Sequence, residues 1–349
     1  VDFLDNADGA LLLEPARTNN FTDGNNVAET LGVSNATIIQ NNNTSPTGTL
    51  SAAKFTENTS SSSHFARLGS SITGQFAISI FAKADGRNRI YLTRDFNNGV
   101  IFNVNTGVVD SYKGSGFTGS IEDYGNGWYR CIVYTTIASA GTFYVATLLD
   151  GSDDPSYTGD GVSSVLLYGS QLEQGSYATS YIPTSGSTVE RVAEVCGLTQ
   201  RVAGIIGQTE GVIYAEIDFK ITDGVSGAWA ISDNTSGSRI TMNTVNNTST
   251  TFTLSVAQNY QSGSTKLTST NVTYSQNHKV AIKYSGTTLK LFVDGIETNS
   301  ITTDGFGDYD KFYIGGNQTG LGSNRRKFIE SKLYNTALTD AELVILTTI

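Results

Sequence analysis

Apolar and polar residues alternate along short segments in the first half of the chain, which is the pattern of half-buried β-strands. The alternation is clear in residues 76–83, 128–135 and 142–149, and it stops at turn-forming residues such as Asp85 and Gly86. Successive segments begin roughly ten residues apart, which is typical of all-β sandwiches. The pattern therefore predicts a jelly-roll domain in this half of the chain.

The second half shows the same period over longer segments. Residues 212–221 place Glu216, Asp218 and Lys220 on one face and apolar residues on the other. Four further strand-like segments follow, at residues 278–284, 289–295, 311–316 and 328–334. This half is therefore also predicted to be a β-sandwich.

One short helix is expected near the end of the sequence. Thr339 and Glu342 have the spacing of a capping box, in which each side chain bonds the backbone N–H of the other residue. The helix should run from about residue 340 to 346. The expected fold class is all-β, with two tandem β-sandwich (jelly-roll) domains and one short C-terminal helix.

The boundary between the domains is expected after a long apolar segment. Residues 165–183 begin as a strand and end at Pro183, which lacks the N–H that a sheet needs. The next residues are rich in Ser, Thr and Gly, as in linkers. We therefore expect a first domain at 1–184, a connecting segment at 185–210 and a second domain at 211–349.

Four motifs of the first half carry a family resemblance. Residues 168–184, read Tyr-Gly-Ser-Gln-Leu-Glu-Gln-Gly-Ser-Tyr-Ala-Thr-Ser-Tyr-Ile-Pro-Thr, and residues 11–19, 127–130 and 157–161 occur in the order expected for that family. They resemble a β-sandwich domain common in bacteriophage tail-fibre and head-spike proteins. The resemblance implies a carbohydrate-binding-module-like fold in a virion appendage, and it names no ligand.

The second half resembles a different family. Residues 278–284, 291–295 and 333–343 stand where the laminin-G-like, concanavalin-type jelly roll has its corresponding strands and helix. This similarity covers about 211–349. It implies a fold and no particular activity.

Charge and composition restrict the partners. The chain has 349 residues and a formal net charge of −10, which argues against nucleic-acid binding, because phosphate contacts need clustered cations. The short basic cluster at 325–327 is expected at a solvated strand edge. No apolar segment approaches the ~18 residues of a membrane helix, so membrane insertion is not expected.

The second half offers one candidate for catalysis. Concanavalin-type glycoside hydrolases place their catalytic carboxylates on one strand face, and Glu216 and Asp218 resemble the start of that pattern. Retaining hydrolysis needs two carboxyl groups about 5–5.5 Å apart, but Lys220 occupies the next position on this face. The only histidines are His64 and His278, too few for a triad or zinc site with the required partners. We therefore expect no enzyme activity, with Glu216 and Asp218 on a solvated strand face.

Glycan binding needs exposed aromatic rings, which stack on sugars, and amide or carboxylate groups, which bond hydroxyls. Two predicted loops of the second half combine these groups. The candidate ligand-binding residues are Trp229, Asp233, Asn234, Asn259, Tyr260 and Gln261.

A calcium site is a further candidate. Asp150, Asp153 and Asp154 share one short loop, and Asp160 follows closely. Calcium takes 6–8 oxygen ligands from flexible loops. Turn formation by Asp, Gly and Ser accounts for the same composition and is the favoured interpretation. Ca²⁺ is the only cofactor that the sequence suggests.

The expected function is that of a non-enzymatic phage virion appendage, a tail fibre or head fibre, which attaches to other virion proteins, binds host-surface glycans, or does both. Phage fibres that resemble this family are commonly trimers, so a homo-oligomer is expected, exposed on the virion. The alternatives are a secreted bacterial adhesin, the binding module of a polysaccharide-degrading protein, and a glycan hydrolase or lyase.

Overall fold

The computed structural model is almost entirely β-structure and divides into two compact units. It describes residues 10–28, 31–70, 73–194, 196–198, 204–219, 226–233, 237–246, 248, 250–260, 263–274, 276–316 and 326–349. Arg17–Arg191 form one unit, called here the first sandwich, and the described parts of Val1–Ala16 and Val192–Ile349 form the second sandwich. The predicted all-β fold with one short C-terminal helix is confirmed. No helix in the described part of the chain has the length and apolar character of a membrane span.

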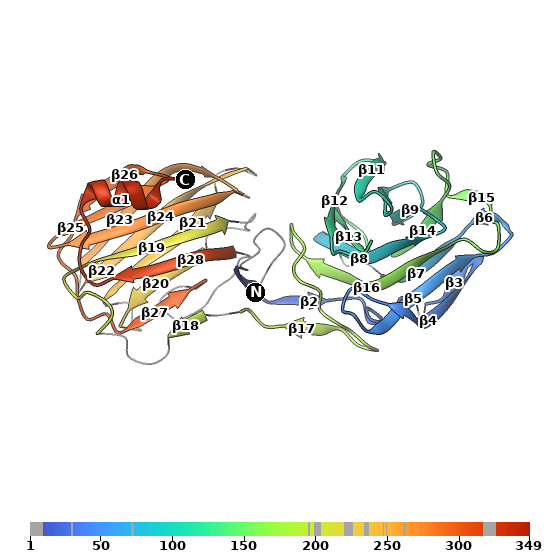
Figure 1. Ribbon diagram of the computed structural model, residues 1–349, viewed down its shortest axis with the longest axis horizontal. Coiled ribbons are helices and arrows are strands. Elements are labelled where there is room, and N and C mark those ends of the chain that lie inside the picture. Colours follow the sequence, from blue (N-terminus) through green and yellow to red (C-terminus); the bar gives the residue numbers. More distant parts are fainter. Residues whose placement is uncertain are drawn as a thin grey trace. The chain divides into compact units, whose positions relative to one another are not determined.

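The first sandwich contains two six-stranded antiparallel sheets (Figure 1). The sheet called here the β9 sheet has the order β11 (Val108–Lys113), β10 (Gly99–Asn103), β9 (Arg89–Thr93), β14 (Thr142–Leu148), β7 (Phe65–Ser70) and β3 (Val33–Ser34). The β8 sheet has the order β12 (Phe117–Asp123), β13 (Tyr129–Ile137), β8 (Gly74–Asp85), β16 (Ser164–Gln174), β5 (Leu50–Glu57) and β4 (Ala36–Thr44). Two short pairs complete it, β6 (Ser61–Ser63) with β15 (Ser156–Thr158), and β2 (Arg17–Asn19) with β17 (Val189–Arg191).

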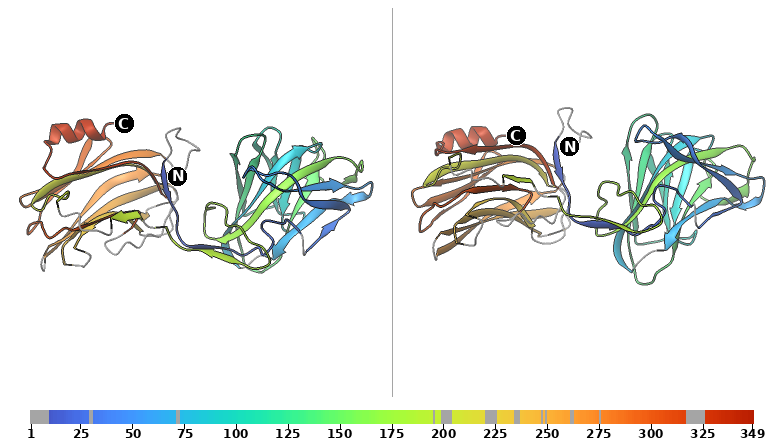
Figure 2. Two further views of the ribbon diagram at one scale, coloured as in Figure 1. Left: turned by 60° about the horizontal axis from the view of Figure 1, so that its bottom comes forward. Right: turned by 90° about the horizontal axis from the view of Figure 1, so that it is seen from below.

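The core of this sandwich follows from the period-two pattern of its strands. Alternate residues such as Ile78, Ile80, Leu92 and Phe102 lie in one fully buried cluster between the sheets. Their neighbours in sequence point to the outer faces, where the functional groups described below are placed. Figure 2 shows the layers of each sandwich from two further directions.

The closing motif at 168–184 is held by buried side-chain hydrogen bonds. Gln171 Oε1 accepts the backbone N–H of Ile182 at 2.6 Å, and Glu173 Oε1 accepts that of Thr179 at 2.8 Å. Asn19, which is fully buried, donates to the carbonyls of Ser170 and Ile182 and accepts from Phe21 and Leu172. Buried backbone groups need such partners. The motifs at 11–19 and 168–184 therefore meet around Asn19.

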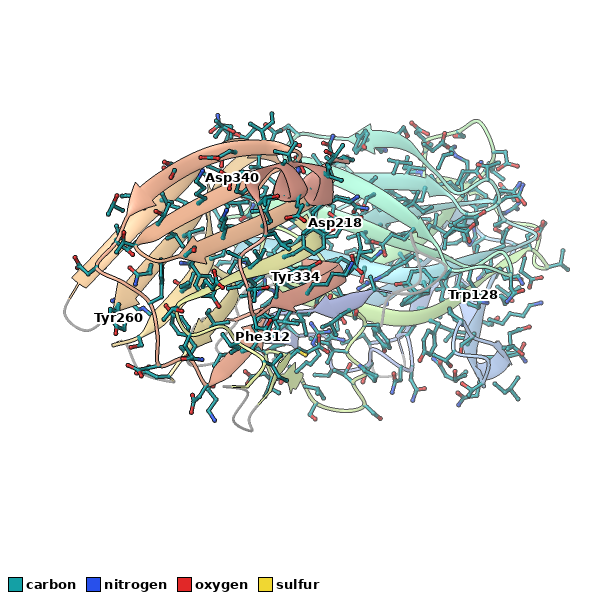
Figure 3. All side chains as sticks on the ribbon, turned by 60° about the vertical axis from the view of Figure 1, so that its left-hand side comes forward. Trp128, Asp218, Tyr260, Phe312, Tyr334 and Asp340 are labelled. Atoms are coloured by element: carbon teal, nitrogen blue, oxygen red, sulfur yellow. The ribbon has the colours of Figure 1, made fainter. Side chains whose placement is uncertain are left out.

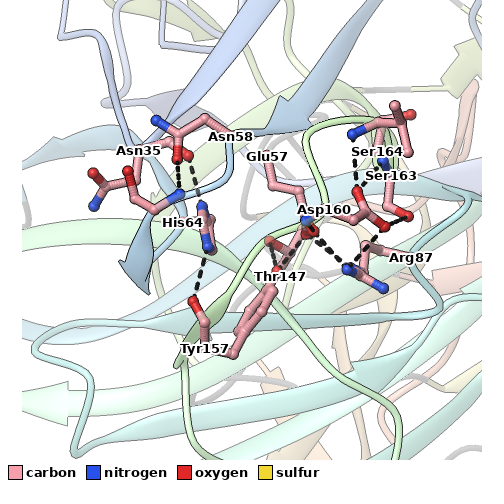
Figure 4. Close-up of polar contacts among 12 residues, drawn as sticks. Asn35, Glu57, Asn58, His64, Arg87, Thr147, Tyr157, Asp160, Ser163 and Ser164 are labelled. Atoms are coloured by element: carbon pink, nitrogen blue, oxygen red, sulfur yellow. Dashed lines mark hydrogen bonds and ion pairs between the residues drawn. The ribbon is translucent and has the colours of Figure 1, made fainter.

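A second buried network holds the loop that contains Tyr157 and Asp160 (Figure 4). The Glu57 carboxylate accepts from Arg87 Nε at 2.7 Å, from the Tyr157 hydroxyl at 2.6 Å and from the Asp160 backbone N–H at 2.9 Å. His64 contacts the backbone oxygen of Tyr157 at 3.3 Å. The motif at 157–161 thus has a structural role.

The second sandwich also has two six-stranded sheets. The β19 sheet has the order β1 (Leu11–Leu13), β28 (Arg326–Tyr334), β19 (Glu210–Phe219), β24 (Asn277–Ser285), β25 (Thr288–Val293) and β26 (Ile296–Thr302). The β20 sheet has the order β18 (Cys196–Leu198), β27 (Lys311–Ile314), β20 (Ser226–Ser232), β21 (Arg239–Asn246), β22 (Thr251–Tyr260) and β23 (Gly263–Thr273). Helix α1 (Asp340–Thr347) has the predicted capping box of Thr339 and Glu342, and its Leu343 packs on the outer face of the β19 sheet.

The expected boundaries of the two domains need correction. Strand β1 pairs with β28, so Leu11–Leu13 belong to the second sandwich and not to a domain at 1–184. The expected connecting segment at 185–210 also contributes strands to both units, β17 to the first and β18 to the second. Local sequence patterns define a strand but not a partner several hundred residues away. The first sandwich is therefore inserted between β1 and β18.

The basic cluster at 325–327 was predicted to lie on a solvated strand edge, and this prediction is wrong for the described residues of strand β28. Because β28 lies between β1 and β19, Arg326 and Lys327 are buried, with exposed fractions of 0% and 2%. Arg325 lies outside the described residues. Asp218 is also buried rather than solvated, whereas Glu216 is half-buried on the same strand.

Candidate ligand-binding site

Trp229 was predicted to stack on a ligand, and the structure contradicts this. Its exposed fraction is 0%, and it lies in the core of the second sandwich with Ile240 and Met242. The pairing register of β20 and β21 shifts between Gly227 and Trp229, a β-bulge that changes which side chains face inward. The sequence had placed Trp229 in a loop, whereas it lies within strand β20. Trp229 is therefore a core residue.

The other described candidates come together at one end of the β20 sheet. Asn259 pairs with Arg239, which pairs with Ser232 at the end of β20, and Asp233 follows Ser232. Tyr260 lies at the end of β22 (Figure 3), and its ring packs closely against Gly305, where an added Cβ would lie 3.2 Å from Cε1. Asn234 and Gln261 lie outside the described residues.

The four candidate calcium ligands take separate partners. Asp150 accepts from Asn88, and Asp160 accepts from its own loop and from Arg87. Asp154 accepts the backbone N–H of Ser156 as a turn residue does. Within the described residues, no group of three His, Cys, Asp or Glu side chains is placed to hold a metal ion. The predicted calcium site is therefore wrong in this arrangement.

Two of these aspartates instead line a polar pocket of about 430 Å³ in the first sandwich. We call it the outer-face pocket, because Arg89 and Asn103 stand opposite each other on the side of the β9 sheet that faces away from the core. The lining consists of amides, carboxylates and a hydroxyl around one guanidinium: Asn88, Arg89, Asn103, Asp110, Ser111, Asp150, Gly151 and Asp153.

Arg89 anchors this pocket. The residue is buried, with an exposed fraction of 5%. Its guanidinium forms an ion pair with Asp110 through Nε and donates to Asp153 Oδ1 at 2.6 Å. It also donates to the carbonyl oxygens of Leu149 and Ser152, at 3.1 and 2.6 Å. The hydrogen bond from Arg89, together with one from Ser111, lowers the pKa of Asp153. Asp153 is therefore ionised at neutral pH, and the loop at 149–154 is fixed to the sheet.

Several polar atoms of the pocket are left available. Asn103 uses only its oxygen, for the N–H groups of residues 105 and 106, so its amide nitrogen has no partner among the described residues. Asp150 and Asp110 each engage one carboxylate oxygen, with Asn88 and Arg89. These atoms offer both donors and acceptors to a ligand. Of the lining residues, only Asp150 and Asp153 were predicted as ligand-binding groups. The one further signal in the sequence is a charged residue, Arg89, that begins an apolar strand.

A second cavity, of about 450 Å³, lies at the rim of the second sandwich, between the end of β23 and the turn that joins β25 to β26. His278 is buried on one side of it. Its Nδ1 is 2.7 Å from Asp294 Oδ2 and its Nε2 is 2.9 Å from the Thr273 carbonyl oxygen. Both partners are acceptors, so both ring nitrogens donate, as they do in an imidazolium. Burial alone would lower the pKa of His278, but the hydrogen bonds to Asp294 and Thr273 outweigh it and the pKa is raised.

The raised pKa predicts a pH-dependent contribution to stability. A group whose pKa is higher in the folded state stabilises the protein below its unfolded pKa, and this contribution is lost as the pH rises through the folded pKa. We expect Asp294→Asn, which keeps the side-chain shape and suits the positive φ of residue 294, to destabilise the protein by on the order of 1 kcal/mol at about pH 6 and by less at about pH 9. Denaturant unfolding at the two pH values measures this, with the exposed Asp304→Asn as the control. An effect of Asp294→Asn that does not vary with pH would contradict the assignment.

Comparisons with known proteins agree with the fold of the second sandwich. A laminin G family model, described as the concanavalin A-like lectin/glucanases superfamily, matches residues 219–344. A search of curated protein sequences gave no match.

Three solved structures show a low overall similarity to this chain. The CBM40 of the Ruminococcus gnavus IT-sialidase is 15% identical with a TM-score of 0.36, over 45% of this chain and 97% of that chain. The heptameric SAP-like pentraxin of Limulus polyphemus is 12% identical with a TM-score of 0.34, over 42% of this chain and 72% of that chain. Domains LG4-5 of the mouse laminin alpha1 chain are 12% identical with a TM-score of 0.25, over 82% of this chain and 93% of that chain. The second sandwich, whose residues 219–344 match this family model, is a laminin-G-like, concanavalin-type domain in a protein built from β-sandwiches.

Proposed function

We propose that the first sandwich binds neutral glycans in the outer-face pocket. The observation that carries the proposal is an open polar pocket whose walls are fixed by the buried Arg89 and whose Asn103, Asp110 and Asp150 side chains keep unused hydrogen-bonding atoms. Sugar hydroxyls both donate and accept, so a set of fixed amides and carboxylates matches them.

The charge of the pocket selects among glycans. Asp110, Asp150 and Asp153 bring three carboxylates, against the single guanidinium of Arg89. An anionic sugar would meet net negative charge there, and like charges in a partly desolvated site cost binding free energy. The pocket therefore favours neutral sugars.

We also propose that the protein is not an enzyme. A glycosidase needs one carboxyl group that keeps its proton near neutral pH, whereas hydrogen bonding lowers the pKa of Asp153. In the second sandwich Glu216 lies opposite Glu330, but the Glu330 side chain is 43% exposed and forms an ion pair with Lys332 at 2.6 Å. These arrangements suit binding better than proton transfer.

For the biological setting we propose a phage virion appendage, a tail fibre or head fibre, exposed on the virion and docked to other virion proteins. The resemblance of residues 11–19, 127–130, 157–161 and 168–184 to such proteins supports this. A single small polar pocket binds weakly, and a homo-oligomer, with a trimer as the expected state, would multiply weak contacts through effective concentration.

Binding of a glycan array by the wild-type protein and by matched variants tests the glycan-binding proposal. Asp150→Ala should weaken the binding of neutral oligosaccharides about tenfold, since it removes hydrogen bonds between a charged group and hydroxyls. Asp154→Ala removes a carboxylate from the same loop that does not line the pocket, and binding should be unchanged. Equal effects of the two variants, or binding to acidic glycans alone that Asp150→Ala leaves intact, would contradict the pocket as the neutral-glycan site.

A further inference from the structure

A second group of side chains on the outer face of the β9 sheet is not explained by the pocket. Phe65, Phe96 and Tyr144 form an aromatic cluster in which Phe96 and Tyr144 are stacked, with centroids 5.2 Å apart and ring planes at 28°. Phe65 lies 5.0 Å from Phe96 and meets Tyr144 edge-on at 5.2 Å. All three side chains are half-buried, so their rings are partly exposed to solvent. We call this group the aromatic platform.

Phe96 reaches the platform through a strained backbone. Its φ is +61°, a left-handed conformation that bulky residues rarely adopt. The loop around it is fixed by Asp95, which accepts the N–H groups of Asn97 and Asn98 at 3.0 and 2.9 Å, and by Thr93, which accepts that of Phe96 at 2.9 Å. Strain of this kind persists only where the surroundings enforce it, and it is concentrated at functional sites.

The platform also carries a cation, that of Arg67, and a hydroxyl, that of Tyr144. Arg67 stands opposite Tyr144 across the β7–β14 pair, on the same face, and its guanidinium carbon lies 5.1 Å from the centroid of the Phe65 ring. Among the described residues, neither the Arg67 guanidinium nor the Tyr144 hydroxyl has a hydrogen bond or ion pair with another side chain.

We propose that the aromatic platform binds a sugar that bears a carboxylate, as uronic and sialic acids do. The guanidinium of Arg67 offers two parallel N–H donors, the geometry that a carboxylate accepts. Phe96 and Tyr144 provide ring faces for the apolar C–H side of the sugar, and the Tyr144 hydroxyl can bond a sugar hydroxyl. The site thus combines a charge contact, a stacking surface and a polar contact within one sheet face.

The platform is separate from the outer-face pocket. On strand β9, Arg89 lies in the outer-face pocket, and Thr93 pairs with Tyr144 of the platform. The two positions are four residues apart, which is about 13 Å along a strand. Between them lies the buried Tyr91, covered by Lys113, whose Nζ is 5.5 Å from the Tyr91 ring centroid and donates to the Asp153 carbonyl at 3.1 Å. The two sites also differ in charge, so each can be tested without the other.

An array of uronic-acid and sialic-acid oligosaccharides, each printed beside its carboxyl methyl ester, tests the proposal with the full chain. The wild-type protein should bind the free acids at least about tenfold better than the esters, and less tightly as salt is raised. Arg67→Gln should lower binding of the acids about tenfold, and Arg67→Lys should lower it less, since it keeps the charge and loses the paired donors. Phe96→Ala should lower binding of the acids as well, because it removes a stacking face.

Matched controls separate the site from general effects of charge and stability. Lys83→Gln removes one positive charge from the β8 sheet of the same sandwich and should leave acid binding unchanged, as should Asp150→Ala in the outer-face pocket. Arg67→Gln should keep the thermal transition of the wild type, since among the described residues its guanidinium makes no hydrogen bond or ion pair and lies only over the Phe65 ring. The proposal is overturned if no acidic glycan binds, if esters bind as well as acids, or if Arg67→Gln binds like the wild type.

Discussion

Replacing Trp229 by alanine should destabilise the second sandwich by about 3–5 kcal/mol, because the substitution empties the space of a large, fully buried aromatic side chain. Trp229 pairs with Met242 and Ile314 in the two adjacent strands. Met242 belongs to the same buried core, and Ile314 packs against that core. Denaturant unfolding of the wild type and the variant measures the loss. Tyr260→Ala, which removes a half-buried aromatic ring from the same sandwich, should cost less.

The same variant separates stability from binding. At a temperature where Trp229→Ala is still folded, its binding to neutral glycans should equal that of the wild type, since the outer-face pocket belongs to the other sandwich. A small loss of stability with a large loss of binding would show that Trp229 contacts ligand after all and would contradict its place in the core.

Glu57→Gln should destabilise the first sandwich by a similar amount, about 3–5 kcal/mol near neutral pH. The Glu57 side chain is 0% exposed and balances the charge of Arg87, whose side chain is 16% exposed. Replacing the carboxylate by an amide leaves Arg87 with only the longer contact to Asp160, at 3.3 Å, and also weakens the bonds from Tyr157 and from the Asp160 N–H. The loop at 157–161 would then lose its anchor.

The effect of Glu57→Gln should fade in acid. Burial would raise the pKa of Glu57, but the hydrogen bonds from Arg87, Tyr157 and the Asp160 N–H outweigh it, so the pKa is lowered. A lowered pKa stabilises the fold above the unfolded pKa, and the contribution is lost as the pH falls through the folded value. Unfolding at about pH 7 and about pH 4 compares the two regimes, with the exposed Glu190→Gln as the control. An equal loss at both pH values would contradict an ionised Glu57.

The fold could be read from the sequence wherever one strand carries its own pattern. The alternation in residues 212–221 predicted β19, and the spacing of Thr339 and Glu342 predicted the start of α1, because both signals are local. The pairing of β1 with β28 could not be predicted in this way, since nothing in residues 11–13 specifies a partner at 326–328. The domain boundary was misplaced for that reason.

The candidate site was harder to predict, because it is assembled from four separate segments. Asp150 and Asp153 were recognised as ligand-binding groups, but the chemistry assigned to them was calcium coordination. Arg89, Asn103 and Asp110 complete the pocket, and only the register of β9, β10 and β11 brings them to the aspartates. The error at Trp229 has a different origin, since the residue was expected in a loop but lies within strand β20, with its side chain in the core.

A crystal structure of the protein with the neutral oligosaccharide that it binds most tightly on the array tests the central claim most directly. We expect the sugar in the outer-face pocket, with hydroxyls about 3 Å from the Asn103 amide nitrogen and from the free oxygen of Asp150, and with Arg89 unmoved between Asp110 and Asp153. A well-ordered neutral sugar bound only to the second sandwich, with the pocket holding no sugar, would contradict the assignment of neutral-glycan binding to the first sandwich.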